Sequence, residues 1–160
     1  MSKQPIIIEV SNLLKAKVSY GPGGVDAKKL EETEAMIRGL QSEYVVWVLD
    51  DLKKLQVSLE AALMAGTDDR AAPVRQIFET AHDMKGQGGS FDYGLMTQVS
   101  AQLCSFIDSR TIYSDQDMEV IRLHVDALRL VIAQKMVGDG GGGGKGLLRG
   151  LQAVISKIGS

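Results

Sequence analysis

Apolar and polar positions follow a helical period along most of this chain. From Asp26 to Leu63, apolar residues recur in steps of three, four and seven, which predicts one long amphipathic helix. Asp26 suits the N-cap of this helix, and the turn-forming residues that begin at Gly66 end it. The apolar positions are Leu30, Ile37, Leu40, Tyr44, Val48, Leu52, Leu55, Leu59 and Leu63.

Three shorter segments show the same period. Pro73 suits the first turn of a second helix, which is expected to continue to about Gly89. A third helix is predicted over residues 96–108. A fourth opens at Ser114 and Asp117, which together resemble a capping box. Because strand-like alternation is nearly absent, the predicted fold is all-α, an antiparallel four-helix bundle.

The predicted bundle covers residues 26–137, and both ends of the chain lie outside it. Residues 1–25 are rich in turn-forming positions and are expected to form an irregular arm. Residues 138–146 are nearly all glycine, which predicts a flexible linker. Residues 147–160 carry an apolar stripe, which predicts an extra C-terminal amphipathic helix. We expect this helix to dock on the fourth helix; binding to a membrane surface or to a partner is the alternative.

Composition narrows the classes of function. The formal net charge of the 160 residues is -2, so no overall field draws the chain to nucleic acid or to an anionic membrane. Cys104 is the single cysteine and can form no internal disulfide, so we expect a reducing, cytoplasmic setting. The apolar run near the N-terminus is too short for a membrane span. His82 and His124 lie in different predicted helices, so we expect no metal site.

The candidate chemistry is concentrated around His82. On a helical wheel this residue lies at the border between the apolar face and solvent. Lys85, Gly86 and Gly89 follow at i+3, i+4 and i+7 on the same border. A neutral imidazole offers a ring nitrogen as a nucleophile, and a nearby ammonium group neutralises phosphate oxygens. An exposed histidine with a flanking lysine would therefore suffice to accept a phosphoryl group from a partner that supplies the remaining groups.

The glycines in this segment need an explanation, because a glycine inside a helix costs about 1 kcal/mol relative to alanine. Gly86, Gly88 and Gly89 occur within four residues. They could leave a surface without side chains, so that another protein can approach His82. They could equally form a glycine-rich helix end, or let two helices pack closely. The spacing alone leaves these alternatives open.

The segment His82-x-x-Lys85-Gly86, with its run of small residues and Phe91, resembles the signature of the histidine-containing phosphotransfer (HPt) domains of two-component phosphorelays. The resemblance covers roughly residues 40–137. It implies an antiparallel four-helix bundle with the histidine exposed on the second helix. It also implies that His82 is phosphorylated, that Lys85 stabilises the phosphate, and that the glycines leave room for a docking receiver domain.

Three positions depart from the family pattern. Gln87 stands where the family often has a small residue, and Asp92 where it often has glycine. Cys104 stands where a glutamine of the third helix often assists the phosphate. Gln102, or else Gln98, is expected to take that role, with Gln102 preferred.

Three residues that precede His82 by one or two turns are expected to belong to the docking surface. Arg75 and Glu79 would contribute to a charged rim and Phe78 to an apolar centre. Phe78 fits the core equally well. Glu79 fits either an acceptor that orients the imidazole or an ordinary surface glutamate.

The leading hypothesis is a phosphohistidine carrier without kinase or ATP-binding machinery. It would accept a phosphoryl group on His82 from an aspartyl-phosphate receiver domain and pass it to another receiver aspartate. The expected partners are response-regulator receiver domains and a hybrid histidine kinase, with Mg²⁺ on the partner receiver, no cofactor on this chain and a monomeric state. The alternative is a helical adaptor or decoy that binds a receiver or kinase without carrying phosphate. A hydrolase or kinase is disfavoured, because no carboxylate cluster or nucleotide loop is visible.

Overall fold

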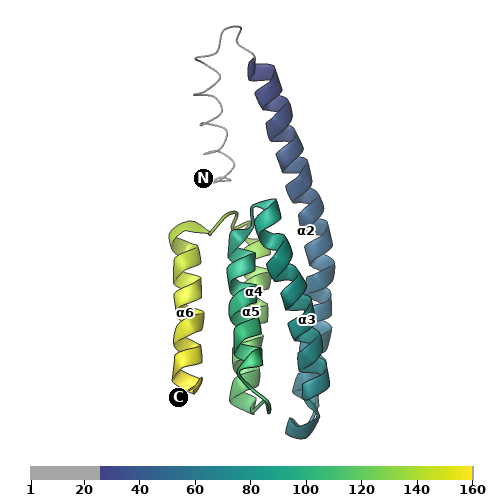
Figure 1. Ribbon diagram of the computed structural model, residues 1–160, viewed down its shortest axis with the longest axis vertical. Helices are drawn as coiled ribbons and strands as arrows, with labels where there is room; N and C mark the ends of the chain where they lie inside the picture. Colours follow the sequence, from purple (N-terminus) through teal and green to yellow (C-terminus); the bar gives the residue numbers. More distant parts are fainter. Residues whose placement is uncertain (1–25, 160) are drawn as a thin grey trace.

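The computed structural model describes residues 26–159, which form helices and turns without a strand (Figure 1). The all-α prediction is confirmed, whereas the arm predicted for residues 1–25 lies outside the described residues. No described helix is long and apolar enough to cross a membrane. In chain order the elements are α2 (Asp26–Met64), the 3-10 turn η1 (Thr67–Asp69), α3 (Ala71–Gly88), the 3-10 turn η2 (Gly89–Phe91), α4 (Gly94–Asp108), α5 (Asp115–Ala133) and α6 (Gly141–Gly159).

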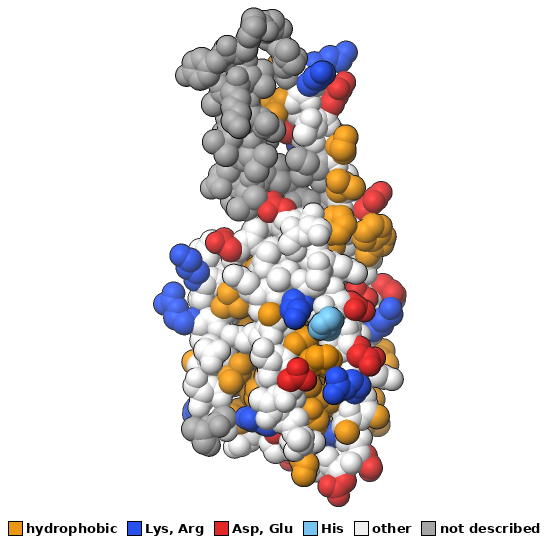
Figure 2. All heavy atoms as spheres, in the orientation of Figure 1, with side chains coloured by type: hydrophobic (Ala, Val, Ile, Leu, Met, Phe, Trp, Pro, Cys, Tyr) orange, Lys and Arg blue, Asp and Glu red, His pale blue; other side chains and the backbone are white. Residues whose placement is uncertain are grey.

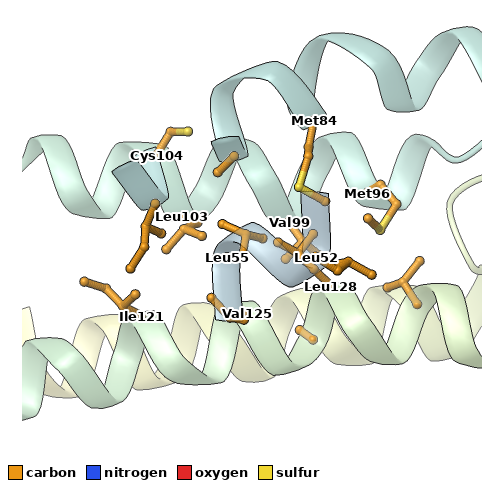
Figure 3. Close-up of a cluster of buried hydrophobic side chains, with 14 of the residues drawn as sticks. Leu52, Leu55, Met84, Met96, Val99, Leu103, Cys104, Ile121, Val125 and Leu128 are labelled. Carbon is orange, nitrogen blue, oxygen red and sulfur yellow. The ribbon is translucent and has the colours of Figure 1, made fainter. Parts of the chain in front are cut away.

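Helices α2 to α5 enclose one core, and each packs against two of the others. Helix α3 lies between α2 and α4, and α5 contacts α4 and α2 from the other side. Their apolar faces, predicted from the helical period, are mostly the faces that are buried, but Leu40 and Leu63 of α2 are corrections to that prediction, since each is 45% exposed. Leu40 lies in the part of α2 beyond the other described helices, where no neighbouring helix covers it. Figure 3 shows part of this core, to which all four helices contribute: Leu52, Leu55, Met84, Met96, Val99, Leu103, Cys104, Ile121, Val125 and Leu128.

Helix α2 is much longer than its neighbours, with 39 residues against 18 in α3. Its residues from Tyr44 onward contribute to the core cluster, and its N-terminal half projects beyond the other described helices (Figure 1). The continuous apolar period of this segment explains why the helix does not stop at the edge of the bundle. The projecting half therefore exposes side chains that a shorter helix would lack.

Arg70 connects the ends of three helices. Its guanidinium is buried and donates to the backbone carbonyl of Ala62 in α2 (3.2 Å) and to that of Tyr113 (2.9 Å). A third N–H donates to the carboxylate of Asp115 at the start of α5 (2.8 Å). Because Arg70 immediately precedes α3, these bonds fix where α3 begins relative to α2 and α5.

The predicted capping box of α5 is present. The backbone N–H of Asp117 donates to Oγ of Ser114 (3.1 Å), and the Ser114 N–H donates to the Asp117 carboxylate (3.0 Å). Arg110 also donates to this carboxylate (3.1 Å). The buried Asp117 is thus fully engaged, which sets the start of α5.

The linker predicted over residues 138–146 is wrong in its extent, because α6 begins at Gly141 and not at residue 147. The first glycines form a tight turn: Gly140 has a φ of 74°, and a Cβ on Gly144 would stand 1.9 Å from the carbonyl oxygen of Asp139. The remaining glycines are helical because α6 is anchored by its apolar stripe. As predicted, that stripe packs on the bundle, at α5 and α4, through Leu147, Leu148, Leu151, Val154, Ile155 and Ile158.

Candidate functional site

His82 is exposed on α3, between the buried residues Ala81 and Met84. Lys85, one turn further, is half-buried, and Gly86 is exposed. This arrangement confirms that His82 lies at the border of the apolar face. In Figure 2 a histidine is visible on the face in view, among basic and acidic side chains. Its imidazole is therefore accessible to another protein.

An aromatic side chain supports the imidazole from one side. The rings of Phe78 and His82 are stacked, with centroids 6.0 Å apart and planes inclined by 26°. The guanidinium of Arg75 lies 4.8 Å from the centroid of the Phe78 ring, in a cation–π contact. Phe78 is itself half-buried and packs against the core. Phe78 therefore contacts both the core and the exposed His82, so its position is compatible with either of the two roles that the sequence left open.

Lys85 is positioned through its backbone by α4. Oγ1 of Thr97 donates to the carbonyl oxygen of Lys85 (2.9 Å), which ties the two helices together one turn beyond His82. This threonine was not a predicted site residue. The signal available in the sequence was a polar residue on a largely apolar helix, which is too common to single out.

Cys104 faces α3 at the level of Phe78, with Sγ 3.8 Å from the Phe78 carbonyl oxygen. Burial raises the pKa of this thiol to about 11, and the nearby Lys85 ammonium opposes the rise. The side chain is therefore a neutral thiol at physiological pH. It fills the space between the helices and has only a weak donor to offer.

The three glycines of this segment have different roles. A Cβ on Gly88 would stand 2.5 Å from Oγ1 of Thr97 and 2.7 Å from the carbonyl oxygen of Tyr93, so this position permits close packing of α3 on α4. A Cβ on Gly86 or Gly89 would meet nothing within 4 Å. Close packing thus explains Gly88 only, and the other two glycines leave an open surface on the His82 side of α3.

Glu79 and Asp83 lie towards α2. Glu79 is exposed and lines a shallow groove between α2 and α3, together with Lys53 and Lys54 of α2. The carboxylate of Asp83 contributes to raising the pKa of Asp51 in α2, after the larger effect of burial. The border of the site on this side is therefore charged, with both signs present.

The prediction that Gln102 stabilises the phosphate is not supported by its position. Its side-chain amide lies 3.0 Å from Nε2 of His124 and 3.3 Å from the side-chain oxygen of Gln152 in α6. On a helical wheel it lies about 160° from Cys104, the residue that faces α3. Gln102 therefore connects α4 to α5 and α6. Gln98 is exposed.

His124 is fully buried, and both ring nitrogens have partners. Nδ1 lies 2.8 Å from the Val120 carbonyl oxygen, so it donates there, and Nε2 faces the Gln102 amide. Burial lowers the pKa of His124, and the bond to Val120 opposes this shift. His124 is thus a neutral structural residue. Among residues 26–159, no three His, Cys, Asp or Glu side chains are grouped so that they could hold a metal ion.

An aromatic cluster joins the end of α3 to α2. The ring of Phe91, in η2, stacks on Tyr44 with centroids 5.0 Å apart, and it meets the Trp47 ring edge-on at 5.7 Å. Tyr93 also contacts Tyr44 (5.2 Å). Tyr44 lies on the predicted apolar face and is buried, whereas Trp47 was not a predicted site residue and is 52% exposed. The sequence offered one sign that Trp47 belongs to this cluster, which is that it follows Tyr44 by three residues on the same predicted helix.

Comparison with known families agrees with this geometry. The Hpt domain model matches residues 43–134, more than half of the chain. The chain therefore belongs to the Hpt domain family, whose members are phosphohistidine carriers of two-component phosphorelays and not kinases. The match includes the whole of α3 and α4 and leaves out the projecting half of α2 and all of α6. Neither the curated proteins nor the solved structures compared with this chain include a significant match.

Proposed function

We propose that this chain relays phosphoryl groups between receiver domains and that His82 is the residue that carries them. The observation that supports this most is the exposed imidazole of His82, held against Phe78 and followed by the open positions Gly86 and Gly89. An ordinary surface histidine needs neither an aromatic support nor a neighbouring surface without side chains. We take helices α2 to α5 to be the antiparallel four-helix bundle typical of the family.

The transfer needs little chemistry from this chain. A ring nitrogen of neutral His82 attacks the phosphorus of an aspartyl phosphate on the receiver domain. The new N–P bond forms as the P–O bond to the carboxylate breaks, and the carboxylate leaves with the electron pair. The proton on the other ring nitrogen stays in place, so the phosphorylated ring is cationic. Transfer to a second receiver aspartate reverses these steps.

Positioning and charge stabilisation supply most of the catalysis in such transfers. The ammonium group of Lys85, one helical turn from His82, would interact with the phosphoryl oxygens. Mg²⁺ would come with the receiver domain. Gly86 and Gly89 would let the receiver's aspartate approach the imidazole, because no side chain stands between them.

The docking surface is proposed to surround His82 on α3. Phe78 would contribute its half-buried ring, Arg75 the cation that lies over that ring, and Glu79 an acidic group towards α2. Such a mixture of an apolar centre and a charged rim is typical of transient interfaces. Gln102 is left out of the proposed site because its side chain points towards α5 and α6.

Label transfer tests the proposal. Purified wild type, His82→Gln and Asp83→Asn are incubated with a panel of phosphorylated receiver domains, and acid-labile, base-stable label on the chain is followed. Asp83 is the neighbouring exposed residue on α3, so Asp83→Asn is the matched control. We expect label on the wild type and on Asp83→Asn, and none on His82→Gln. Receiver binding without label on any variant would contradict the carrier and favour an adaptor.

A further inference from the structure

Helix α2 carries exposed apolar side chains, from its projecting half to Trp47 at the edge of the bundle, that the site around His82 does not explain. Met36 is 65% exposed, Leu40 45% and Trp47 52%. At 100° per residue these three positions lie within about 40° of one another on the helix. Exposed hydrophobic side chains also follow one edge of the upper part of the molecule in Figure 2. We use the name α2 stripe for Met36, Leu40 and Trp47 of α2 together with Phe91 of η2.

The α2 stripe is continuous with the surface around His82. Gly89 lies seven residues beyond His82, which is about 10 Å along a helix axis. Phe91 follows in η2, and its ring contacts Trp47 at 5.7 Å. Open positions and aromatic rings thus lead from the imidazole to α2.

The size of a specific interface places Trp47 within reach of a partner centred on His82. A standard interface covers about 800 Å² on each protein, which corresponds to a disc with a radius of about 16 Å. Such a disc extends past Gly89 to the contact between Phe91 and Trp47. A smaller, transient interface would still reach Gly89.

The shape of the molecule favours a globular occupant. From Asp26 to Tyr44, the residue level with Phe91, α2 rises about 27 Å, close to the diameter of a small domain. A domain that presents an aspartate to His82 over Gly86 and Gly89 would therefore lie beside the projecting helix. Its flank would face Leu40 and Met36.

We propose that the α2 stripe is a second contact element for the receiver domain, with Trp47 at the edge of the surface around His82. This inference rests on the function proposed above. It concerns residues 36 and 40 in particular, which precede the residues matched by the family model. The contact would increase the affinity for the receiver without taking part in the phosphoryl transfer.

The only tryptophan of the chain provides a direct probe. A tryptophan-free receiver domain is selected from the panel by its binding to the His82→Gln protein, so that the selection does not depend on transfer. Titration with this receiver should shift the Trp47 emission to shorter wavelength. Leu40→Ser should weaken binding about fivefold to tenfold, as expected for a contact of moderate strength at an interface.

Two matched controls lie in the groove between α2 and α5, on the opposite side of the bundle from α3. Leu130 is 44% exposed, like Leu40, and Leu49 is 51% exposed, like Trp47. Leu130→Ser and Leu49→Ala should leave receiver affinity unchanged, whereas Leu40→Ser and Trp47→Ala should lower it. Circular dichroism checks that all four variants are folded.

The inference is overturned if calorimetry detects receiver binding while Trp47 emission stays constant and Leu40→Ser binds like wild type. It is also overturned if sedimentation shows that the chain alone forms a dimer that Leu40→Ser dissociates, since a second copy would then occupy the stripe. A shifted emission with weakened Leu40→Ser binding supports the stripe even where no label is transferred. Failure of the carrier function is thus distinguished from failure of this inference.

Discussion

Gly88 of α3 lies so close to Thr97 of α4 that a Cβ at position 88 would stand 2.5 Å from the threonine Oγ1. The backbone of α4 is also near, with the Thr97 nitrogen at 3.0 Å. Oγ1 of Thr97 in turn donates to the carbonyl of Lys85. The packing of α3 on α4 is therefore closest one to two turns beyond His82, and it fixes the backbone of the residue proposed to stabilise the phosphate.

Alanine substitutions should separate the packing glycine from the open ones. Gly88→Ala should destabilise the protein by about 1–3 kcal/mol, because the added methyl group forces the two helices apart. Gly86→Ala should raise stability by up to about 1 kcal/mol, since the helix gains propensity and meets no neighbour. Urea unfolding of each variant measures both effects. Equal destabilisation by the two substitutions would contradict the distinction.

The same variants test access to His82. Gly86→Ala and Gly89→Ala should slow label transfer from a receiver domain while leaving the chain folded, because a methyl group now stands in the proposed approach. Rapid-quench measurement of the transfer rate checks this expectation. Wild-type rates in both variants would show that the open surface is not used by the receiver.

Removal of the aromatic support should affect His82 itself. Phe78→Ala should slow phosphoryl transfer about tenfold, because an imidazole without the stacked ring samples orientations that are poor for in-line attack. Phe78→Leu is the control that retains burial but removes the stacking. The transfer rate at saturating receiver reports the effect, and thermal unfolding reports the accompanying loss of stability. If both variants transfer like wild type, the stacking has no positioning role.

The hydrogen bonds from Arg70 to backbone carbonyls should contribute more to the free energy of unfolding than its ion pair with Asp115. Arg70→Ala should destabilise the protein by about 2–3 kcal/mol, because the carbonyls of Ala62 and Tyr113 lose their buried donor. Asp115→Ala should cost less than about 1 kcal/mol, because the Asp115 side chain is 91% exposed and its ion pair is solvated. Urea unfolding of both variants decides the order. A larger effect of Asp115→Ala would reverse this assignment.

The buried His124 should make the protein sensitive to acid. Burial lowers its pKa from the ordinary value of 6.5, so the unfolded chain binds a proton that the folded chain does not. The contribution of His124 is therefore fully present above pH 6.5 and is lost as the pH falls from there through the folded-state pKa. The free energy of unfolding should decrease as the pH falls below 6.5, and more steeply in wild type than in His124→Gln. Parallel curves for the two proteins would exclude His124 as the cause.

The helices and the position of His82 could be predicted because both follow from local periodicity. The steps of three and four residues in α2 and α5 identify the faces that are buried, and the same wheel places His82 at the edge of the apolar face of α3. The capping box of Ser114 and Asp117 is likewise a local interaction between residues three apart. Such features depend on a single helix and not on its neighbours.

The roles of the glycines and glutamines depend on which helix lies opposite, and the sequence does not contain that information in a local form. Gly86 and Gly88 are two residues apart, yet one faces open space and the other contacts Thr97. Gln102 was expected near the phosphate, but its side chain meets His124 and Gln152 on the other side of α4. A polar residue can bond on either border of a helix, so only the packed structure decides between them.

By itself, the sequence determined the class of fold and the chemical group at the site, since hydrophobic periodicity and a histidine beside a lysine are properties of one segment at a time. The tertiary structure alone decided that Phe78 supports the imidazole, that α6 begins within the glycine run, and that Phe91 joins the His82 surface to Trp47. These features arise when residues distant in the chain compete for the same space. The free energy of burial, summed over several helices, then outweighs the local preference of any one residue.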